Sequence, residues 1–89
     1  MIKKTLTMTP KLGLHAKPAG MFVREACRFQ SEIMLCKDGA GEVNGKSVMQ
    51  LMLLAAEYGS KVTLRITGPD EAQALAAIER LFVRKFDEE

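Results

Sequence analysis

The residue best placed to do chemistry in this 89-residue chain is its one histidine, His15. It lies between Gly13 and Pro18, where a glycine-containing loop passes into the first turn of a predicted helix. A helix N-terminus presents free backbone N–H groups and a partial positive charge, so it binds anions. A neutral imidazole at this point would be a nucleophile aimed into an anion site, and the anion it would suit is a phosphoryl group. The alternative is a histidine that fills a capping position without reacting, and its position alone favours that interpretation.

The neighbours of His15 narrow the chemistry. Pro18 has no N–H, but the backbones of Ala16 and Lys17 still offer theirs, and Lys17 adds a full positive charge. Neither a carboxylate nor a second histidine lies close by in the sequence, which argues against a hydrolase or another turnover enzyme. One histidine and two distant cysteines lack the spacing of a zinc site, and no G-x-G-x-x-G or Walker A motif is present. We therefore expect neither a metal nor a cofactor.

Ser47 is the second candidate site. Ser47 and Gln50 have the spacing of a capping box, in which the serine side chain caps the helix and the glutamine side chain bonds back to the backbone N–H of the serine. This structural role is expected. Phosphorylation of the same hydroxyl is the other possibility, since a phosphate at a helix N-terminus is electrostatically favourable.

The stretch that follows Ser47 is unusually apolar, because Gln50 is the one polar residue in 48–56. Leu51 and Leu54 can serve a core, and the remaining apolar residues would then face outwards. A helix buried on two sides would be the alternative, but full burial is difficult in a small domain, so we expect an exposed docking patch. Methionine suits a surface that meets several partner shapes. The residues expected in this patch are Val48, Met49 and Met52.

Alternating residues predict the strands. Period-two alternation indicates half-buried strands over 2–9 and 61–67, with Lys4 as the one break in the first apolar series. A short apolar run indicates a buried strand over 32–37. After a glycine-containing turn at 38–41, Glu42-Val43 can begin the returning strand.

Helical spacing predicts three helices between and after these strands. The first has apolar residues over 19–27 and begins at about 15–18. The second is expected over 47–58, with Gly59 placed to end it, and the third from Asp70 onwards. The order strand-helix-strand-strand-helix-strand-helix predicts an α+β fold of one domain, 1–89, with helices covering one side of a mostly antiparallel sheet. The inward face of the third helix is expected to contain Leu75, Ile78, Leu81 and Phe82.

Composition excludes several classes of protein. Thirteen basic and eleven acidic residues leave a net charge of +2, which does not suggest a nucleic-acid binder. An RNA-recognition motif is also excluded, since the aromatic residues fall in or beside predicted helices. The longest apolar run, Leu51–Ala56, is too short to insert into a membrane, and no signal peptide is evident. Cys27 and Cys36 are expected in the core, and two such cysteines without an export signal point to the reducing cytoplasm.

Two motifs carry a family resemblance. The segment 13–19, Gly-Leu-His-Ala-Lys-Pro-Ala, resembles the active-site motif of the HPr family of histidine phosphocarriers, and 44–49 resembles its regulatory motif. The similarity covers essentially the whole chain. It implies an open-faced β-sandwich with a four-stranded antiparallel sheet in the order 1-4-2-3 and three helices on one face. It also implies that His15 accepts a phosphoryl group from enzyme I through Nδ1. His15 would then pass the group to a histidine of an EIIA-type acceptor in sugar uptake.

The resemblance also suggests roles for other residues. Lys17 stands where the family usually has arginine; it would stabilise the phosphoryl group but lacks the planar fork that grips two oxygens. Ser47 matches the serine that HPr kinase/phosphorylase modifies in many members. Met21 and Arg24 match the docking surface formed with the apolar patch of the second helix. A carrier with an open face is expected to work as a monomer.

Three functional hypotheses remain open. One is a phosphocarrier for sugar uptake, and another is a regulatory, nitrogen-type phosphorelay paralogue with no transport role. The third is a regulatory binding protein that works through Ser47 with His15 silent, although the presence of His15 argues against silence. Whether the carrier counts as an enzyme is left open, since it would be phosphorylated transiently rather than turn over a substrate.

Overall fold

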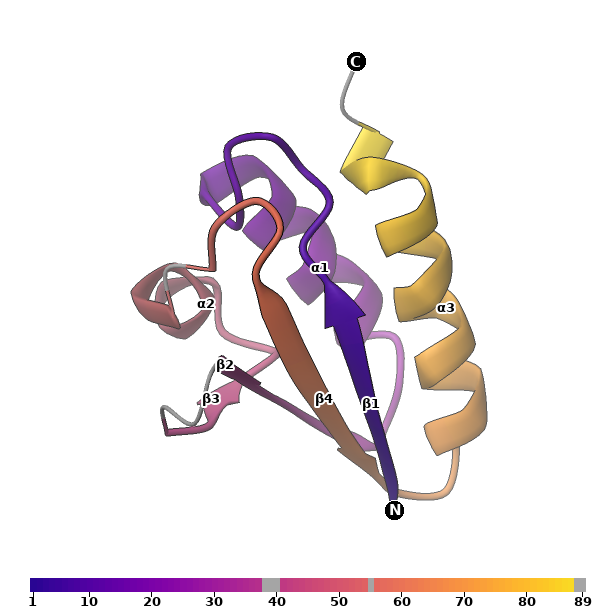
Figure 1. The fold of residues 1–89 in the computed structure, drawn as a ribbon. Helices are drawn as coiled ribbons and strands as arrows, with labels where there is room; N and C mark the ends of the chain where they lie inside the picture. Colours follow the sequence, from indigo (N-terminus) through magenta and orange to yellow (C-terminus); the bar gives the residue numbers. More distant parts are fainter. Residues whose placement is uncertain (38–40, 55, 88–89) are drawn as a thin grey trace.

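The computed structural model describes residues 1–37, 41–54 and 56–87 (Figure 1). Its elements follow the predicted order, with one additional short 3-10 turn near the C-terminus. The turn predicted at 38–41 lies mostly outside the described residues. The elements are β1 (Ile2–Thr7), α1 (Ala16–Ala26), β2 (Glu32–Lys37), β3 (Val43–Asn44), α2 (Val48–Leu54), β4 (Lys61–Thr67), α3 (Glu71–Val83) and η1 (Lys85–Asp87).

The four strands form one sheet in the order β1-β4-β2-β3, and every pairing is antiparallel. The central strand is β4, in which Leu64 lies opposite Lys4 of β1 and opposite Leu35 of β2. All three α-helices lie on the same side of the sheet (Figure 1). The expected open-faced sandwich is therefore confirmed, including its strand order.

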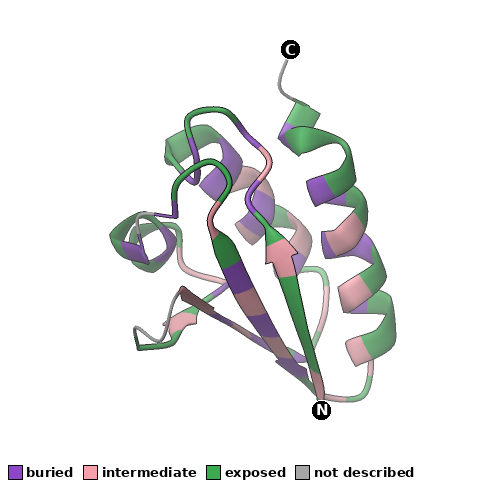
Figure 2. Ribbon diagram, in the orientation of Figure 1, coloured by how far each residue is buried: buried purple, intermediate pink, exposed green. Residues whose placement is uncertain are grey.

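The two faces of the sheet follow from the alternation in the strands. In β4, Val62, Leu64 and Ile66 point to the helices and are buried, while Thr63 and Arg65 lie on the open face (Figure 2). Burying apolar side chains of this size stabilises a fold by about 1.5–3 kcal/mol each, so the helix-facing layer is the main source of stability. From the helices, the core receives Phe22, Leu51, Leu54, Ile78, Leu81 and Phe82.

Lys4, the break in the apolar series of β1, lies on the helix-facing side yet is not buried. Its ammonium group reaches α3, where Nζ lies 3.0 Å from Oε2 of Glu79. Because β1 is an edge strand, this side chain can run along the border of the core and keep its charge in water. Such a half-exposed ion pair contributes about 0–1 kcal/mol.

The second helix is shorter than predicted. It ends at Leu54 among the described residues, and Ala56 through Tyr58 are not helical, so the predicted end at Tyr58 was wrong. The reason is tertiary: the carbonyl of Ala56 accepts a hydrogen bond at 2.8 Å from the N–H of Leu14, in the loop before α1. Gly59, with a φ of +83°, instead makes the turn into β4.

Neither cysteine lies in the core, so that prediction was also wrong. Cys27 is exposed because α1 ends at Ala26 and the chain turns away just after it. Cys36 is partly exposed because it alternates with buried Leu35 and lies on the open face of β2. Within the described ranges, the structure contains no helix of the length and apolar character needed to cross a membrane.

Candidate functional site

His15 is the N-cap residue of α1, with an extended backbone (φ −94°, ψ −167°). Its carbonyl oxygen accepts a hydrogen bond from the N–H of Ala19 at 2.9 Å, which begins the helix. The imidazole is exposed and makes no capping hydrogen bond with the described part of the chain. Since the imidazole is not used to cap the helix, the side chain remains available for chemistry.

Backbone contacts fix the loop before His15. Gly13 has a φ of +74° and donates its N–H to the carbonyl of Pro10 at 2.9 Å. A Cβ at Gly13 would overlap the carbonyl oxygen of Ala56, so only glycine lets the two backbones lie this close. Leu14 is buried and is tied to the same carbonyl. These contacts set the position from which the His15 side chain projects.

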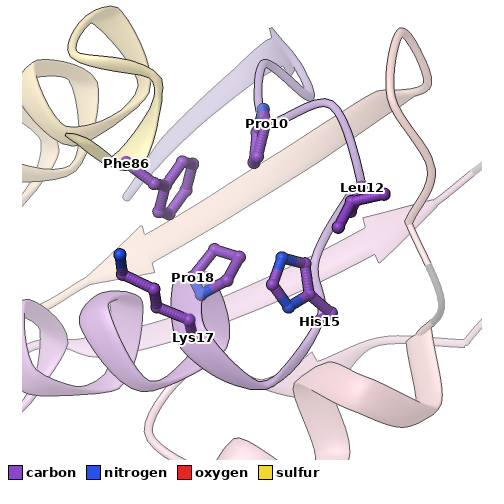
Figure 3. Close-up of a pocket in the computed structure, with 6 residues that line it drawn as sticks. All are labelled: Pro10, Leu12, His15, Lys17, Pro18 and Phe86. Carbon is purple, nitrogen blue, oxygen red and sulfur yellow. The ribbon is translucent and has the colours of Figure 1, made fainter. Parts of the chain in front are cut away.

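A cavity of about 200 Å³ opens beside His15 (Figure 3). Prolines from the loop and from the first turn of α1 form part of its wall, and Phe86 from the C-terminal turn forms another part. Sequence reasoning missed Phe86, although it lies four residues after Phe82 and could have been read as a continuation of the apolar face of α3. The cavity is lined by Pro10, Leu12, His15, Lys17, Pro18 and Phe86.

The first turn of α1 has the charge pattern of an anion site. The segment 16–19 contains no acidic residue, and the first N–H groups of a helix lack partners within the helix. Ala16 and Lys17 supply two of these groups. The Lys17 side chain extends away from the His15 ring, with Pro18 between them (Figure 3), although it is exposed and long enough to reorient. The site can therefore hold an anion on backbone amides, with lysine as a mobile charge.

Ser47 forms half of the predicted capping box. Its Oγ accepts a hydrogen bond from the N–H of Gln50 at 3.2 Å. The Gln50 side chain does not return to Ser47; its Oε1 accepts instead from the N–H of Asn44 at 2.8 Å. The Ser47 hydroxyl is partly exposed, so it can act as a cap and still be reached by a kinase.

An apolar surface on α2, here named the α2 patch, lies on the helix side that faces away from the core. It consists of Val48, Met49, Met52 and Leu53, all exposed. The first three are exposed, as expected, and their role in docking stays a prediction. Leu53, 77% exposed, was not predicted, although its spacing of four from Met49 indicates the same helix face.

A shallow groove along α1 shares Lys17 with the cavity beside His15. Met21 is half-buried and Arg24 exposed, and both line this groove. The rest of its lining is Ala16, Lys17, Gly20 and the acidic Asp87. The two docking residues proposed on α1 therefore line the same groove as Lys17. The described residues contain no group of three His, Cys, Asp or Glu side chains that could hold a metal ion.

Comparison with known proteins supports this arrangement. The family model described as the PTS HPr component phosphorylation site matches residues 2–84. Phosphocarrier protein HPr from Treponema pallidum is 49% identical, with complete coverage of both chains. The HPr-like protein Crh of Halalkalibacterium halodurans is 49% identical over 88% of this chain and 92% of its own. The crystal structure of HPr-C-His from Thermoanaerobacter tengcongensis has a TM-score of 0.94, at 42% identity, covering 100% of this chain and 99% of that chain. The chain belongs to the HPr family.

Proposed function

We propose that this chain is a phosphocarrier in which His15 accepts a phosphoryl group from enzyme I and passes it to a histidine of an EIIA-type acceptor in sugar uptake. The observation that carries the proposal is the exposed His15 imidazole at the N-terminus of α1, which makes no capping hydrogen bond. The family membership supports the phosphoryl group as its cargo.

The transfer is an exchange of one N–P bond for another. A ring nitrogen of His15 attacks the phosphorus of the donor phosphohistidine as the donor N–P bond breaks. The electron pair of that bond stays on the donor ring, which takes up a proton while the His15 ring gives up its own. Such transfers need positioning and charge stabilisation more than covalent help. The amides of Ala16 and Lys17 would stabilise the phosphoryl oxygens, each exposed interaction contributing about 0.3–1 kcal/mol. Modest stabilisation suits a carrier, because a tightly held phosphoryl group would not be passed on.

Docking of both partners is assigned to the surface around the site. The α2 patch offers exposed apolar area, and Met21 and Arg24 add a mixed surface on α1. One face that serves donor and acceptor in turn must bind each of them weakly, and flexible methionines suit that task. We further propose that the carrier works as a monomer in the cytoplasm.

Phosphorylation by phosphoenolpyruvate, magnesium and enzyme I, read by intact mass, tests this function. One acid-labile phosphoryl group is expected on the wild-type chain and none on His15→Ala. Lys17→Ala is the companion variant, expected to be phosphorylated more slowly. Absence of transfer from the cognate enzyme I to the folded wild-type chain would contradict the proposal.

A regulatory role through Ser47 is the second candidate. The similarity to the HPr-like Crh proteins supports this regulatory role as a candidate. A phosphate placed on Ser47 by an HPr kinase/phosphorylase would stand at the edge of the α2 patch and change its partners. Sugar uptake in cells that carry His15→Ala separates the two roles, because a transport carrier loses uptake and a regulator or nitrogen-type phosphorelay does not.

A further inference from the structure

The chain ends α3 in an unusual way. Three successive residues of η1, Lys85, Phe86 and Asp87, have left-handed backbones, with φ between +54° and +56°. This conformation is costly for residues that carry a Cβ, so surrounding contacts must hold it. A hydrogen bond from the N–H of Asp87 to the carbonyl of Arg84 at 2.9 Å and an ion pair between their side chains close the turn.

The result of the turn is that Phe86 is directed back into the molecule. It is only 2% exposed, and its ring meets that of Phe82 edge-to-face, with centroids 5.0 Å apart. The α-helix itself ends at Val83, before this turn. The left-handed turn makes the Phe86 ring one wall of the cavity beside His15 (Figure 3).

A second contact ties the same loop to the same helix end. The hydroxyl of Thr9 donates a hydrogen bond at 2.8 Å to the carbonyl of Phe82, in the last turn of α3. Pro10 follows directly and is buried in the same cavity wall. The loop 9–14 is therefore held between the end of α3 on one side and the Ala56 carbonyl on the other.

We propose that Phe86 is a positioning residue of the phosphorylation site: it closes the apolar side of the His15 cavity and protects the phosphoryl group on His15 from water. This inference rests on the proposed function, since it concerns the same phosphohistidine. The family match ends at residue 84, so the turn that carries Phe86 lies outside the matched stretch.

The reaction that Phe86 suppresses is hydrolysis. A water oxygen attacks the phosphorus, the N–P bond of phospho-His15 breaks, the ring nitrogen keeps the electron pair and takes up a proton, and inorganic phosphate leaves. Attack requires a water molecule at the phosphorus, in line with the breaking N–P bond, and an apolar wall beside the phosphoryl group reduces the water that can gather there.

The test is the half-life of phospho-His15 in full-length variants loaded chemically with phosphoramidate, so that loading does not depend on enzyme I. Phe86→Ala is expected to lose the phosphoryl group about threefold to tenfold faster than wild type. The matched control is Val83→Ala, which removes an 81% exposed apolar side chain from the same helix end and is expected to leave the half-life unchanged. Thermal unfolding of each variant confirms that the loss is measured on folded protein.

Each result decides the proposal. A folded Phe86→Ala with the wild-type half-life overturns it, as does an equal shortening in Val83→Ala. Should Phe86→Ala not fold, Phe86→Leu decides alone: a shortened half-life supports the proposal and a wild-type half-life overturns it. Failure of enzyme I to phosphorylate the wild-type chain would reject the proposed function without changing these half-lives, so the two failures are distinguishable.

Discussion

Asp70, the residue before α3, holds Ser31, the residue before β2, through two hydrogen bonds. Its Oδ1 accepts both the backbone N–H of Ser31, at 3.0 Å, and the Ser31 hydroxyl. Its Oδ2 accepts the N–H of Gln30 at 2.9 Å. Asp70 thus stabilises the link between α1 and β2 rather than capping its own helix. These donors, the Ser31 hydroxyl first, hold the pKa of the Asp70 carboxyl below its usual value.

Asp70→Asn is expected to lower the free energy of unfolding at neutral pH, because an amide group cannot accept all three hydrogen bonds. A lowered pKa in the folded state stabilises the fold above the unfolded pKa of about 3.9, and this contribution disappears as the pH falls towards the folded value. Urea unfolding at pH 7 and below pH 4 should therefore show a difference between variant and wild type that shrinks in acid. A difference of equal size at both pH values would contradict this account. Glu79→Gln is the control, because it removes an acidic side chain from an exposed ion pair and leaves the Asp70 hydrogen bonds in place.

Gly13→Ala is expected to destabilise the fold and slow phosphorylation of His15. The new Cβ would meet the carbonyl oxygen of Ala56, and a φ of +74° is strained for alanine, together costing about 1–3 kcal/mol. Gly20→Ala is the matched control, because no atom lies within 4 Å of its added Cβ and it stands inside α1. It should raise stability by about 0.5–1 kcal/mol. Thermal unfolding measures the stability of both variants, and the rate of His15 phosphorylation measures their activity. Equal effects from the two variants would show that the contact between Gly13 and the Ala56 carbonyl is unimportant.

Local patterns were sufficient for the fold because helices and strands here follow their sequence periods closely. Periodicity, short apolar runs and turn residues predicted the order of elements, and β2 and β4 match their predicted bounds at 32–37 and 61–67. The predicted bounds were wrong where a contact with a residue far away in the sequence determines where a helix ends. The end of α2 depends on the Leu14 amide that binds the Ala56 carbonyl. Such contacts between residues far apart in sequence leave no periodic signal in either segment.

The same limit applies to the candidate site: its locally encoded residues were predictable, and those brought in from far along the chain were not. His15, the first turn of α1 and three residues of the α2 patch follow from local spacing and type. Phe86 was missed because a left-handed turn, which no glycine marks, returns it to the site from the far end of the chain. The cysteines were misplaced because one position past a helix end changes a residue from buried to exposed, as at Cys27.

Lys17→Arg is expected to speed phosphoryl transfer or to lengthen the life of phospho-His15. Lysine offers a point charge, whereas arginine presents a planar fork that can donate to two phosphoryl oxygens at once. Because the Lys17 side chain is exposed and extends away from His15, the exchange should leave the fold intact. Rapid-quench kinetics with enzyme I and the decay of the phosphorylated form measure the two effects. Arg80→Lys, at an exposed position on α3, is the control for exchanging one basic side chain for the other. No change in either quantity for Lys17→Arg would contradict this prediction.

Met49→Ser and Leu53→Ser are expected to raise the KM for phosphorylation by enzyme I while leaving the free energy of unfolding nearly unchanged. Both side chains are at least 75% exposed, so their removal takes little from the core, and apolar contacts at the centre of an interface typically carry about 1–2 kcal/mol each. Steady-state kinetics with varied carrier concentration measure the effect. Val83→Ser, equally exposed but on α3, should behave as wild type. A wild-type KM for both α2 variants would place docking elsewhere.

Ser47→Asp is expected to weaken the productive encounter with enzyme I without unfolding α2. Aspartate is as good an N-cap as serine, so the bond now made by the Gln50 amide to Ser47 Oγ can be replaced. The added charge stands beside the α2 patch, where it must be desolvated when a partner binds, so we expect KM to rise by about fivefold, or ~1 kcal/mol. Gln73→Asp is the matched control, since it adds the same charge in the first turn of α3 and is exposed. Because α3 stands on the far side of the fold from α2 (Figure 1), the same charge there should leave KM unchanged. A rise with both variants would mean that net charge, and not its position beside the α2 patch, controls the encounter.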